Sequence, residues 1–340
     1  MRQNVNDHSR KLHDLLVAEY AKVVDTSTGL LKEEMSEFTD CPLCASKEFR
    51  NLWIKDGFTY VKCQNCEFVY LNPRLNEDVT LEFYNGAWTN CYNQTKFFSS
   101  NDSDDRINFR NLVEISRIVR SGKLLEVGCA TGYFLQAARD RFGFDVFGVE
   151  PNAETSRFCR EERHLKVTTG TLEGADFPES FFDVVYMRDV FEHIREPRQL
   201  LEEIRRVMKR GGLIVVEVPN VDGLIYKLVG KRHVCVFGFE HFNFFSRKSL
   251  EYVFKETGFK TIQVKMESRD FTFLRLVNYF WGKPAFTAVS APATNVPDTV
   301  GFRGVISVIR KFISPIDWAL PRFADALKRG SVMTVYAIRS

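Results

Sequence analysis

One acidic side chain stands directly before a group of small residues that form a ligand-binding pattern. Glu126 lies in an apolar run that begins at residue 124, and Gly128, Ala130 and Gly132 follow it, before a helical pattern over residues 133–138. A glycine turn between a strand and a helix lets a ligand approach backbone amides at the helix N-terminus. A carboxylate beside such a turn favours a ligand with a cationic group, which a pyrophosphate lacks.

The spacing of the small residues argues against a nicotinamide or flavin dinucleotide. That fingerprint requires glycines at the first, third and sixth positions of the turn. Here those positions hold Gly128, Ala130 and Tyr133, and a large aromatic residue at the last one prevents close packing of helix and strand. A turn that serves only the α/β architecture remains the alternative.

A second acid stands where a ribose partner is expected. Glu150 ends the apolar run 144–150, 22 positions after Gly128. An acid about 20 residues after such a turn commonly accepts hydrogen bonds from ribose hydroxyls. The two acids together therefore indicate a nucleoside ligand that carries a positive charge.

Four cysteines have the spacing of a metal site. Cys41 and Cys44 form one C-x2-C pair, Cys63 and Cys66 form another, and 18 residues separate the pairs. This pattern predicts a four-thiolate zinc site, which leaves no open coordination position and therefore builds structure rather than catalyses. Two disulfides or an iron–sulfur site are the alternatives. The other cysteines are interpreted as ordinary small side chains: Cys91, Cys129, Cys159 and Cys235.

A Glu-His pair is the candidate for proton chemistry. Glu240 and His241 lie between an apolar strand at 213–220 and a helix at 247–257, for which Ser246 is a plausible N-cap. The pKa of histidine lies near working pH, so His241 suits the role of general base. The alternative is that His241 only orients the loop.

The elements that position these residues alternate between strands and helices. Apolar strands are expected at 124–127, 144–150, 182–189, 213–220 and 332–338, with helices at 133–138, 200–208 and 247–257. Such alternation predicts an α/β fold with a doubly wound sheet, whose ligands bind at the carboxyl ends of the strands. Both acids and the Glu-His pair fall at that edge.

Over residues 105–265 this pattern resembles the class I S-adenosylmethionine-dependent methyltransferases, which have a seven-stranded sheet. The segment with the four cysteines resembles a zinc ribbon, which continues through residues 67–74 to Phe83 and Tyr84. This combination narrows the resemblance to enzymes that methylate sugars of deoxysugar and surface-polysaccharide biosynthesis. The resemblance implies cofactor contacts at Glu126, Gly128, Ala130, Gly132, Glu150, Thr171, Leu172, Arg188 and His193.

For the acceptor, the resemblance implies O- or C-methylation with His241 as general base and Glu240 beside it. It also implies that Tyr84 and Tyr92 help to cover the substrate. The sequence departs from the sugar C-methyltransferases by having Gly238 where they have a tyrosine, and by lacking their large C-terminal domain.

The expected organisation has six parts. They are a helical extension (1–37), the zinc ribbon (38–75), a substrate-covering linker (76–104), the cofactor-binding core (105–267), a basic helical insertion (268–330) and a final strand (331–340). From residue 271 onward, the sequence has nine Lys or Arg residues and only three acidic residues. Apolar residues at helical spacing over 302–316 predict a basic amphipathic helix, which suits an anionic membrane surface, its own domain or a second subunit.

Whole-chain properties limit the remaining alternatives. The 340 residues are 44% hydrophobic and 27% charged, with a net charge of +3. The sequence predicts a cytoplasmic protein, since it shows no signal-peptide pattern and no apolar run near the roughly 18 residues of a membrane span. This net charge is too small to indicate nucleic acid as a partner by itself. An RNA methyltransferase, a methyltransferase for another small molecule and a non-enzymatic cofactor-binding scaffold remain the competing functions.

Overall fold

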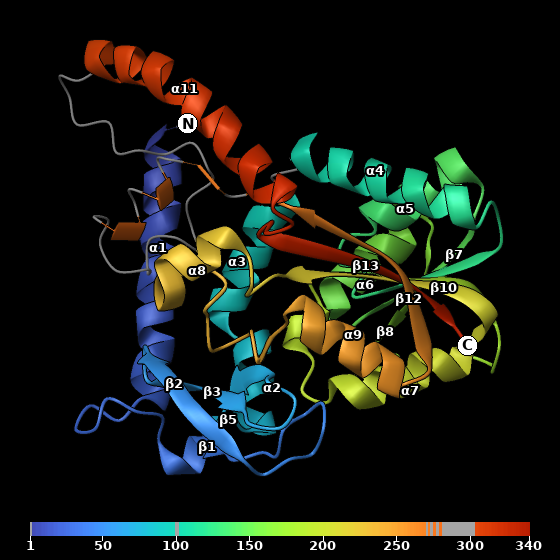
Figure 1. Cartoon of the computed structure of the whole chain (residues 1–340), viewed down its shortest axis with the longest axis horizontal. Coiled ribbons are helices and arrows are strands. Elements are labelled where there is room, and N and C mark those ends of the chain that lie inside the picture. The colour runs from blue at the N-terminus through green and yellow to red at the C-terminus, as the bar shows by residue number, and fades with distance from the viewer. Residues whose placement is uncertain (1, 99–101, 270, 273–274, 277–278, 281–302) are drawn as a thin grey trace.

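The central sheet has seven strands in the order β12-β13-β10-β9-β6-β7-β8. The computed structural model describes residues 2–98, 102–269, 271–272, 275–276, 279–280 and 303–340 (Figure 1). The strands are β6 (Lys123–Val127), β7 (Asp145–Glu150), β8 (Lys166–Thr169), β9 (Phe182–Arg188), β10 (Met208–Pro219), β12 (Phe259–Glu267) and β13 (Val332–Arg339). Strands β8, β7, β6, β9 and β10 are parallel, and β13 is antiparallel to both of its neighbours. The α/β fold with a doubly wound seven-stranded sheet is confirmed.

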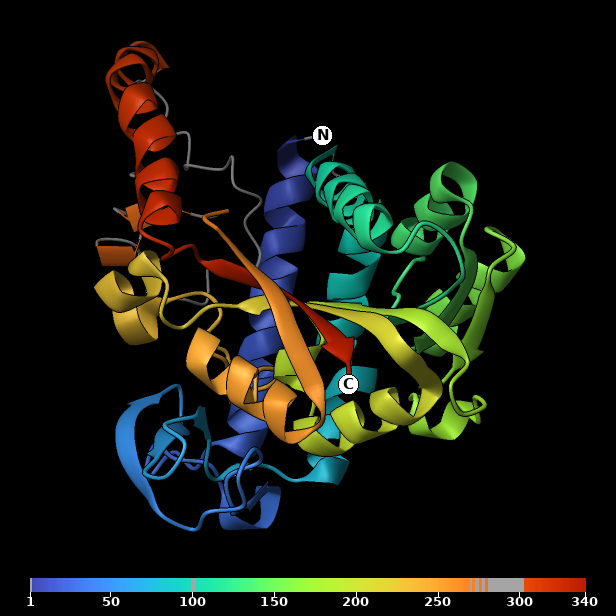
Figure 2. The same cartoon turned by 45° about the vertical axis from the view of Figure 1, so that its right-hand side comes forward.

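Helices pack on both faces of this sheet (Figures 1 and 2). They are α4 (Asp102–Ile118), α5 (Tyr133–Phe142), α6 (Ala153–Glu161), α7 (Pro197–Val207) and α9 (Arg247–Glu256). The predicted cap of α9 is present, since Ser246 accepts from the Ser249 amide and Ser249 accepts from the Ser246 amide. Reciprocal bonds of this kind fix where a helix begins.

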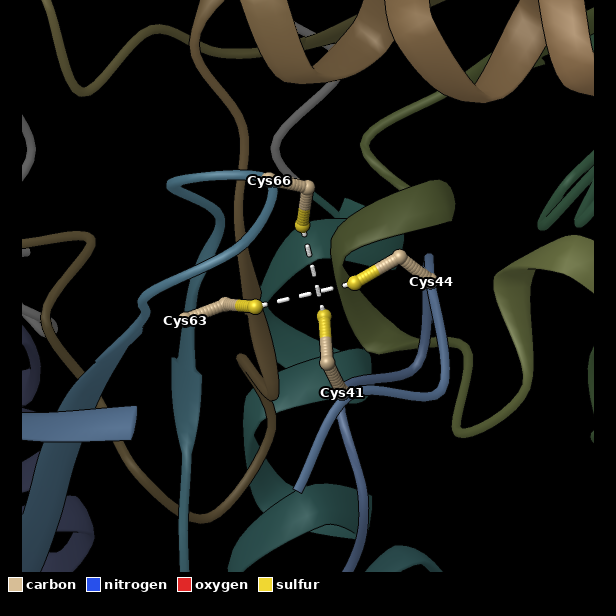
Figure 3. A group of neighbouring side chains, drawn as sticks. All are labelled: Cys41, Cys44, Cys63 and Cys66. Atoms are coloured by element: carbon tan, nitrogen blue, oxygen red, sulfur yellow. Dashed lines mark hydrogen bonds between the residues drawn. The ribbon is translucent and has the colours of Figure 1, made fainter. Parts of the chain in front are cut away.

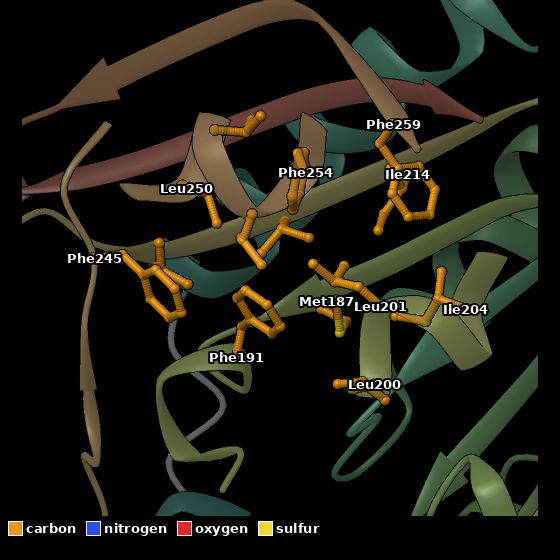
Figure 4. Close-up of a cluster of buried hydrophobic side chains, with 14 of the residues drawn as sticks. Met187, Phe191, Leu200, Leu201, Ile204, Ile214, Phe245, Leu250, Phe254 and Phe259 are labelled. Carbon is orange, nitrogen blue, oxygen red and sulfur yellow. The ribbon is translucent and has the colours of Figure 1, made fainter. Parts of the chain in front are cut away.

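The largest core cluster fills the space between the sheet and the helices α7 and α9 (Figure 4). Met187 and Ile214 come from strands, Leu201 from α7 and Leu250 from α9, and each is fully buried. Each such side chain stabilises the fold by roughly 1.5–3 kcal/mol relative to its exposed state. This packing holds the carboxyl ends of β9 and β10 in fixed positions.

Strand β10 begins earlier than the sequence predicts. Helix α7 ends at Val207, and the strand runs from Met208 with an irregularity in its pairing before Leu213. Gly211 has a φ of 73°, and a Cβ at Gly212 would lie 2.8 Å from a backbone oxygen. Gly211 and Gly212, which lie between the expected helix at 200–208 and the expected strand at 213–220, therefore form a bulge inside β10.

A second, four-stranded sheet lies below the central one, in the order β11-β4-β3-β2. Its strands are β2 (Phe49–Lys55), β3 (Phe58–Cys63), β4 (Val69–Leu71) and β11 (Asn243–Phe244). The first three belong to the ribbon, whereas β11 belongs to the segment that follows β10. The ribbon sheet is thus completed by a strand from the methyltransferase-like part of the chain, far from the ribbon in sequence.

Further N-terminal elements surround the ribbon. They are α1 (Arg2–Val23), η1 (Glu33–Met35), the short pair β1 (Ser36–Glu37) and β5 (Arg74–Leu75), α2 (Glu77–Asn85) and α3 (Ala87–Phe98). Arg74, only 6% exposed, donates to Glu37 at 2.9 Å and to Glu196 at 2.8 Å. This buried arginine connects the N-terminal part to the start of α7.

The C-terminal insertion contains α11 (Arg303–Ala326), which extends away from the core beside α8 (Leu224–Val229) (Figure 1). Ala324 packs on Ile225 and Phe271, whereas Trp318 is 62% exposed and Phe323 58% exposed. The C-terminal turns of this helix, around Leu320 and Ala324, therefore rest on their own chain. The start of the amphipathic pattern, at residue 302, lies outside the described residues, and membrane contact stays a prediction. Among the helices that are described, none has the length and apolar character needed to cross a bilayer.

Candidate functional site

The turn between β6 and α5 has the backbone that its small residues predict. Gly128 and Gly132 have φ values of 71° and 73°, and Ala130 has a φ of 45°. A Cβ at Gly128 would lie 2.5 Å from a methyl of Val190, and one at Gly132 would lie 2.6 Å from Leu165. These glycines are thus required for conformation and for close packing.

Glu126, near the end of β6, has a carboxylate oxygen that lacks a hydrogen-bond partner among the described residues. The residue is 7% exposed, and its Oε2 atom has no hydrogen bond among the described residues. Burial raises the pKa of Glu126 well above its usual range, while the positive charge of Arg188 opposes that shift. A buried, unpartnered carboxyl oxygen fits a ligand with a cationic group such as the ammonium of S-adenosylmethionine.

Glu150 is joined to the same turn by hydrogen bonds. Its Oε2 accepts from the amide of Ala130 at 2.8 Å, and its Oε1 accepts from the amide of Asn152 at 2.9 Å. Burial raises the pKa of Glu150, and these two amides oppose the shift. The carboxylate is therefore fixed beside the turn, and each oxygen retains capacity to accept from a ribose hydroxyl.

Three other residues expected to contact the cofactor lie at or after the carboxyl ends of β8 and β9. Arg188 ends β9 and donates to Asn108 of α4 at 2.7 Å. Thr171 and Leu172 follow β8 directly before η2 (Glu173–Ala175), with Thr171 exposed and Leu172 buried in the core. Leu172 therefore contributes packing.

Four polar side chains from distant segments meet beside the ends of β9 and β10. We call Tyr84, Glu192, His193 and His241 the histidine cluster. The rings of His193 and His241 are 4.6 Å apart between centroids and nearly perpendicular. The hydroxyl of Tyr84 lies 3.3 Å from Nδ1 of His193. His193, expected among the cofactor contacts, thus lies with the candidate catalytic residue.

A backbone carbonyl sets the tautomer of His241. Its Nδ1 lies 2.8 Å from the carbonyl oxygen of Cys235. Because that oxygen only accepts, Nδ1 carries the hydrogen and Nε2 carries the lone pair in the neutral ring. Nε2 of His241 is therefore the atom that can take a proton or bind a cation.

Glu192 is the member of the cluster that sequence reasoning missed as a functional residue. It lies in η3 (Phe191–His193), is 2% exposed, and its Oε2 has no hydrogen-bond partner among the described residues. Burial, and then the charge of Asp189, raise the pKa of Glu192 well above its usual range. Its position next to His193 was the available signal.

The remaining predicted acceptor residues have different surroundings. Burial raises the pKa of Tyr84 well above its usual range, and the charge of Glu240 adds to that shift. Glu240 is half-buried beside His241 in the loop. Tyr92 stacks on Trp88, with ring centroids 5.1 Å apart, in the aromatic core of the N-terminal part.

The glycine in the Glu-His loop has a steric reason. A Cβ at Gly238 would lie 2.2 Å from the ring of Phe58. Phe58 is fully buried and belongs to the ribbon strand β3. The space that a tyrosine would need at position 238 is therefore filled by a ribbon phenylalanine.

The same loop is held between the ribbon and η3. The amide of Phe242 donates to the carbonyl of Glu192 at 3.0 Å, and the amide of Leu71 donates to the carbonyl of Phe242 at 3.0 Å. Asn243 then pairs with Tyr70 to form β11. The backbone next to His241 is thus positioned from both sides.

The four ribbon cysteines meet in one group (Figure 3). The sulfurs of Cys41 and Cys66 are 3.5 Å apart, and those of Cys44 and Cys63 are 3.6 Å apart. All are free thiols, and all four sulfurs lie within 4.8 Å of one another. Zinc–sulfur bonds of about 2.3 Å place tetrahedral sulfurs about 3.8 Å apart, so the group fits a zinc ion and is too open for disulfides.

Comparisons with known proteins agree with the fold. Residues 102–264 match a family model described as a methyltransferase domain. An uncharacterised protein of Methanocaldococcus jannaschii is 28% identical over 200 residues, which cover 58% of this chain and 93% of that protein. The ubiquinone biosynthesis O-methyltransferase of a Bradyrhizobium species is 31% identical over 33% of this chain and 46% of that enzyme.

Two further matches concern a tRNA enzyme and a solved structure. The tRNA U34 carboxymethyltransferase of Pseudomonas aeruginosa is 32% identical over 31% of this chain and 34% of its own length. The crystal structure of an Archaeoglobus fulgidus S-adenosylmethionine-dependent methyltransferase is 21% identical, with a TM-score of 0.46, and covers 69% of this chain and 94% of that one. This chain thus spans less than half of the two curated enzymes with a stated activity. The family match supports an S-adenosylmethionine-dependent methyltransferase domain over residues 102–264.

Proposed function

We propose that this protein transfers a methyl group from S-adenosylmethionine to a hydroxyl group, or to an acidic carbon, of a sugar or glycan. The observation that carries the proposal is the histidine cluster at the carboxyl edge of the sheet, where open α/β sheets bind their ligands. The acceptor can be nucleotide-linked or lipid-linked. A zinc ion on the four cysteines is part of the proposal and has a structural role.

The cofactor is held by residues around the β6–α5 turn. Glu126 faces its ammonium group, Glu150 accepts from its ribose hydroxyls, and Gly128 and Gly132 allow it to approach the backbone. When bound, S-adenosylmethionine supplies an activated methyl group. The chain must then orient the acceptor, exclude water and remove one proton.

His241 is the residue proposed to remove that proton. Its Nδ1 hydrogen is donated to the carbonyl of Cys235, so the lone pair of Nε2 belongs to the side of the ring away from that bond. The hydrogen bonds that hold Phe242 fix the backbone beside it. Glu240 contributes negative charge next to the ring.

A hydroxyl-rich acceptor fits the chemistry of the cluster. A phenol, two imidazoles and a carboxyl group within a small region offer both donors and acceptors, which sugar hydroxyls require. The support from the sequence is the ribbon and its continuation into Tyr84, which resemble sugar methyltransferases. Together these features favour a sugar over an apolar acceptor.

The test is a methyl-transfer assay with labelled S-adenosylmethionine and a panel of nucleotide sugars and glycan oligomers, followed by mass analysis of products. His241→Ala should abolish turnover and leave cofactor affinity nearly unchanged. His164→Ala, which removes an exposed histidine between α6 and β8, is the matched control. Normal turnover in His241→Ala, or an equal loss of cofactor binding, would refute the assigned role of His241.

A further inference from the structure

Three residues of the histidine cluster also have the geometry of a metal site. A carboxylate oxygen of Glu192 and one ring nitrogen each of His193 and His241 lie within 4.8 Å of one another. We infer that these three residues bind one divalent transition-metal cation, such as Mn²⁺ or Zn²⁺, beside the acceptor. The site is separate from the four cysteines and uses one oxygen and two nitrogen ligands.

The buried carboxyl group is the first argument. Glu192 is 2% exposed, and its Oε2 atom has no hydrogen bond among the described residues. An unsatisfied oxygen in such a position is destabilising, because it has lost its water without gaining another partner. A cation on that oxygen provides the missing partner.

The second argument is how the two imidazoles are held. Histidines that ligate metals usually donate their other ring N–H to a carbonyl or another polar group, which orients the ring. His241 does this toward the carbonyl of Cys235, and Nδ1 of His193 contacts the hydroxyl of Tyr84. In His241, Nε2 is then the ligand atom, and the Tyr84 hydroxyl leaves Nε2 of His193 as a ligand atom when Nδ1 of that ring donates to it.

Distances and donor types agree with this assignment. Metal bonds of about 2.1 Å place neighbouring ligand atoms about 3.0–3.4 Å apart, so shifts of roughly 1 Å bring the three residues onto a cation. Two imidazoles and one carboxylate favour first-row transition metals over Mg²⁺ or Ca²⁺, which prefer oxygen ligands only. Three protein ligands also leave open positions for acceptor oxygens.

The cation would change the part that His241 plays. A proton and a metal compete for the same Nε2 lone pair, so His241 is a ligand in the loaded site and a base only in the cation-free site. In the loaded site the cation would polarise a bound hydroxyl of the acceptor, whose proton would leave to solvent as the acceptor binds, before water is excluded for methyl transfer. As that oxygen gains the methyl group, the carbon–sulfur bond breaks and sulfur keeps the electron pair. This consequence rests on the proposed function, whereas cation binding itself does not.

The experiment is a titration of the full-length, zinc-loaded protein with Mn²⁺. Binding is monitored by electron paramagnetic resonance, in which bound Mn²⁺ no longer gives the signal of the free ion. We expect one Mn²⁺ site per chain, because the thiolates retain zinc and Mn²⁺ prefers harder ligands. Glu192→Gln and His241→Ala should each raise the dissociation constant at least about tenfold. His164→Ala should leave it unchanged, and His193→Gln is the second variant if Glu192→Gln does not fold.

The outcomes separate the two proposals. Absence of Mn²⁺ binding at millimolar concentration, or binding that all three cluster variants retain, overturns the cation site even if sugars are methylated. Mn²⁺ binding that the variants remove supports the site even if no sugar in the panel is methylated, and that result would count against the proposed acceptor alone.

Discussion

Two glycines with nearly identical φ values allow the energetic effect of close packing at the turn between β6 and α5 to be measured. Gly128 and Gly143 have φ values of 71° and 72°. A Cβ at Gly143 meets no described atom within 4 Å, whereas one at Gly128 would lie 2.5 Å from Cγ2 of Val190. Alanine at each position therefore introduces the same backbone strain but very different contacts.

The magnitudes follow from these contacts. A left-handed conformation costs an alanine about 1–2 kcal/mol, so Gly143→Ala should reduce the free energy of unfolding by that amount. Gly128→Ala carries the same cost and must also move Val190 by about 1 Å to restore a normal carbon–carbon separation. Overpacking of this kind adds about 1–3 kcal/mol. Val190 is β-branched and stiff, so the turn or η3 must shift.

The assays are urea denaturation for stability and calorimetry for S-adenosylmethionine affinity. Gly128→Ala should weaken cofactor binding at least about tenfold, or 1.4 kcal/mol, because the displaced amides face the ligand. Gly143→Ala should leave affinity unchanged, since it ends α5 far from the turn along the helix. Equal stability losses with unchanged affinity in both variants would show that the contact with Val190 does not shape the cofactor site.

Three further predictions test the ribbon, the loop and the buried ion pair. Elemental analysis should find zinc in the wild-type protein and none in Cys63→Ser. This variant should also lower turnover by up to about a hundredfold, with little change in cofactor affinity, because the ribbon positions the loop of His241; unchanged turnover in a zinc-free variant would contradict this. Gly238→Ala should also lower turnover, since its Cβ would lie 2.2 Å from Phe58, and normal kinetics would exclude that steric argument. Glu217→Gln should reduce the free energy of unfolding by about 3–5 kcal/mol, because both oxygens of this fully buried carboxylate accept from Arg269. Burial raises the pKa of Glu217, but the hydrogen bonds from Arg269 outweigh burial and lower that pKa. The stabilisation that Glu217 provides is therefore present above the unfolded pKa of about 4.3 and is lost as pH falls below that value. Urea midpoints that respond neither to Glu217→Gln nor to this change of pH would refute the argument.

Local patterns carried most of the fold prediction. The strands, the capped helix after Ser246 and the cofactor turn each depend on residues a few positions apart, and the structure has them close to the predicted bounds. The boundary between α7 and β10 was wrong, because Gly211 and Gly212 form a bulge where a helix end was expected. Glycine permits both conformations, and only the pairing with β9 selects one.

The sequence by itself determined the glycine turn between β6 and α5 and the group of four cysteines, since both rest on short spacings that local geometry enforces. Only the tertiary structure decided the histidine cluster, whose members come from α2, η3 and the loop before β11. Two long-range arrangements create it: the adjacent ends of β9 and β10, and the pairing of β11 with the ribbon strand β4. Those pairings are set by the burial of side chains such as Phe58 and Phe245 across the whole molecule, and no local pattern contains that information.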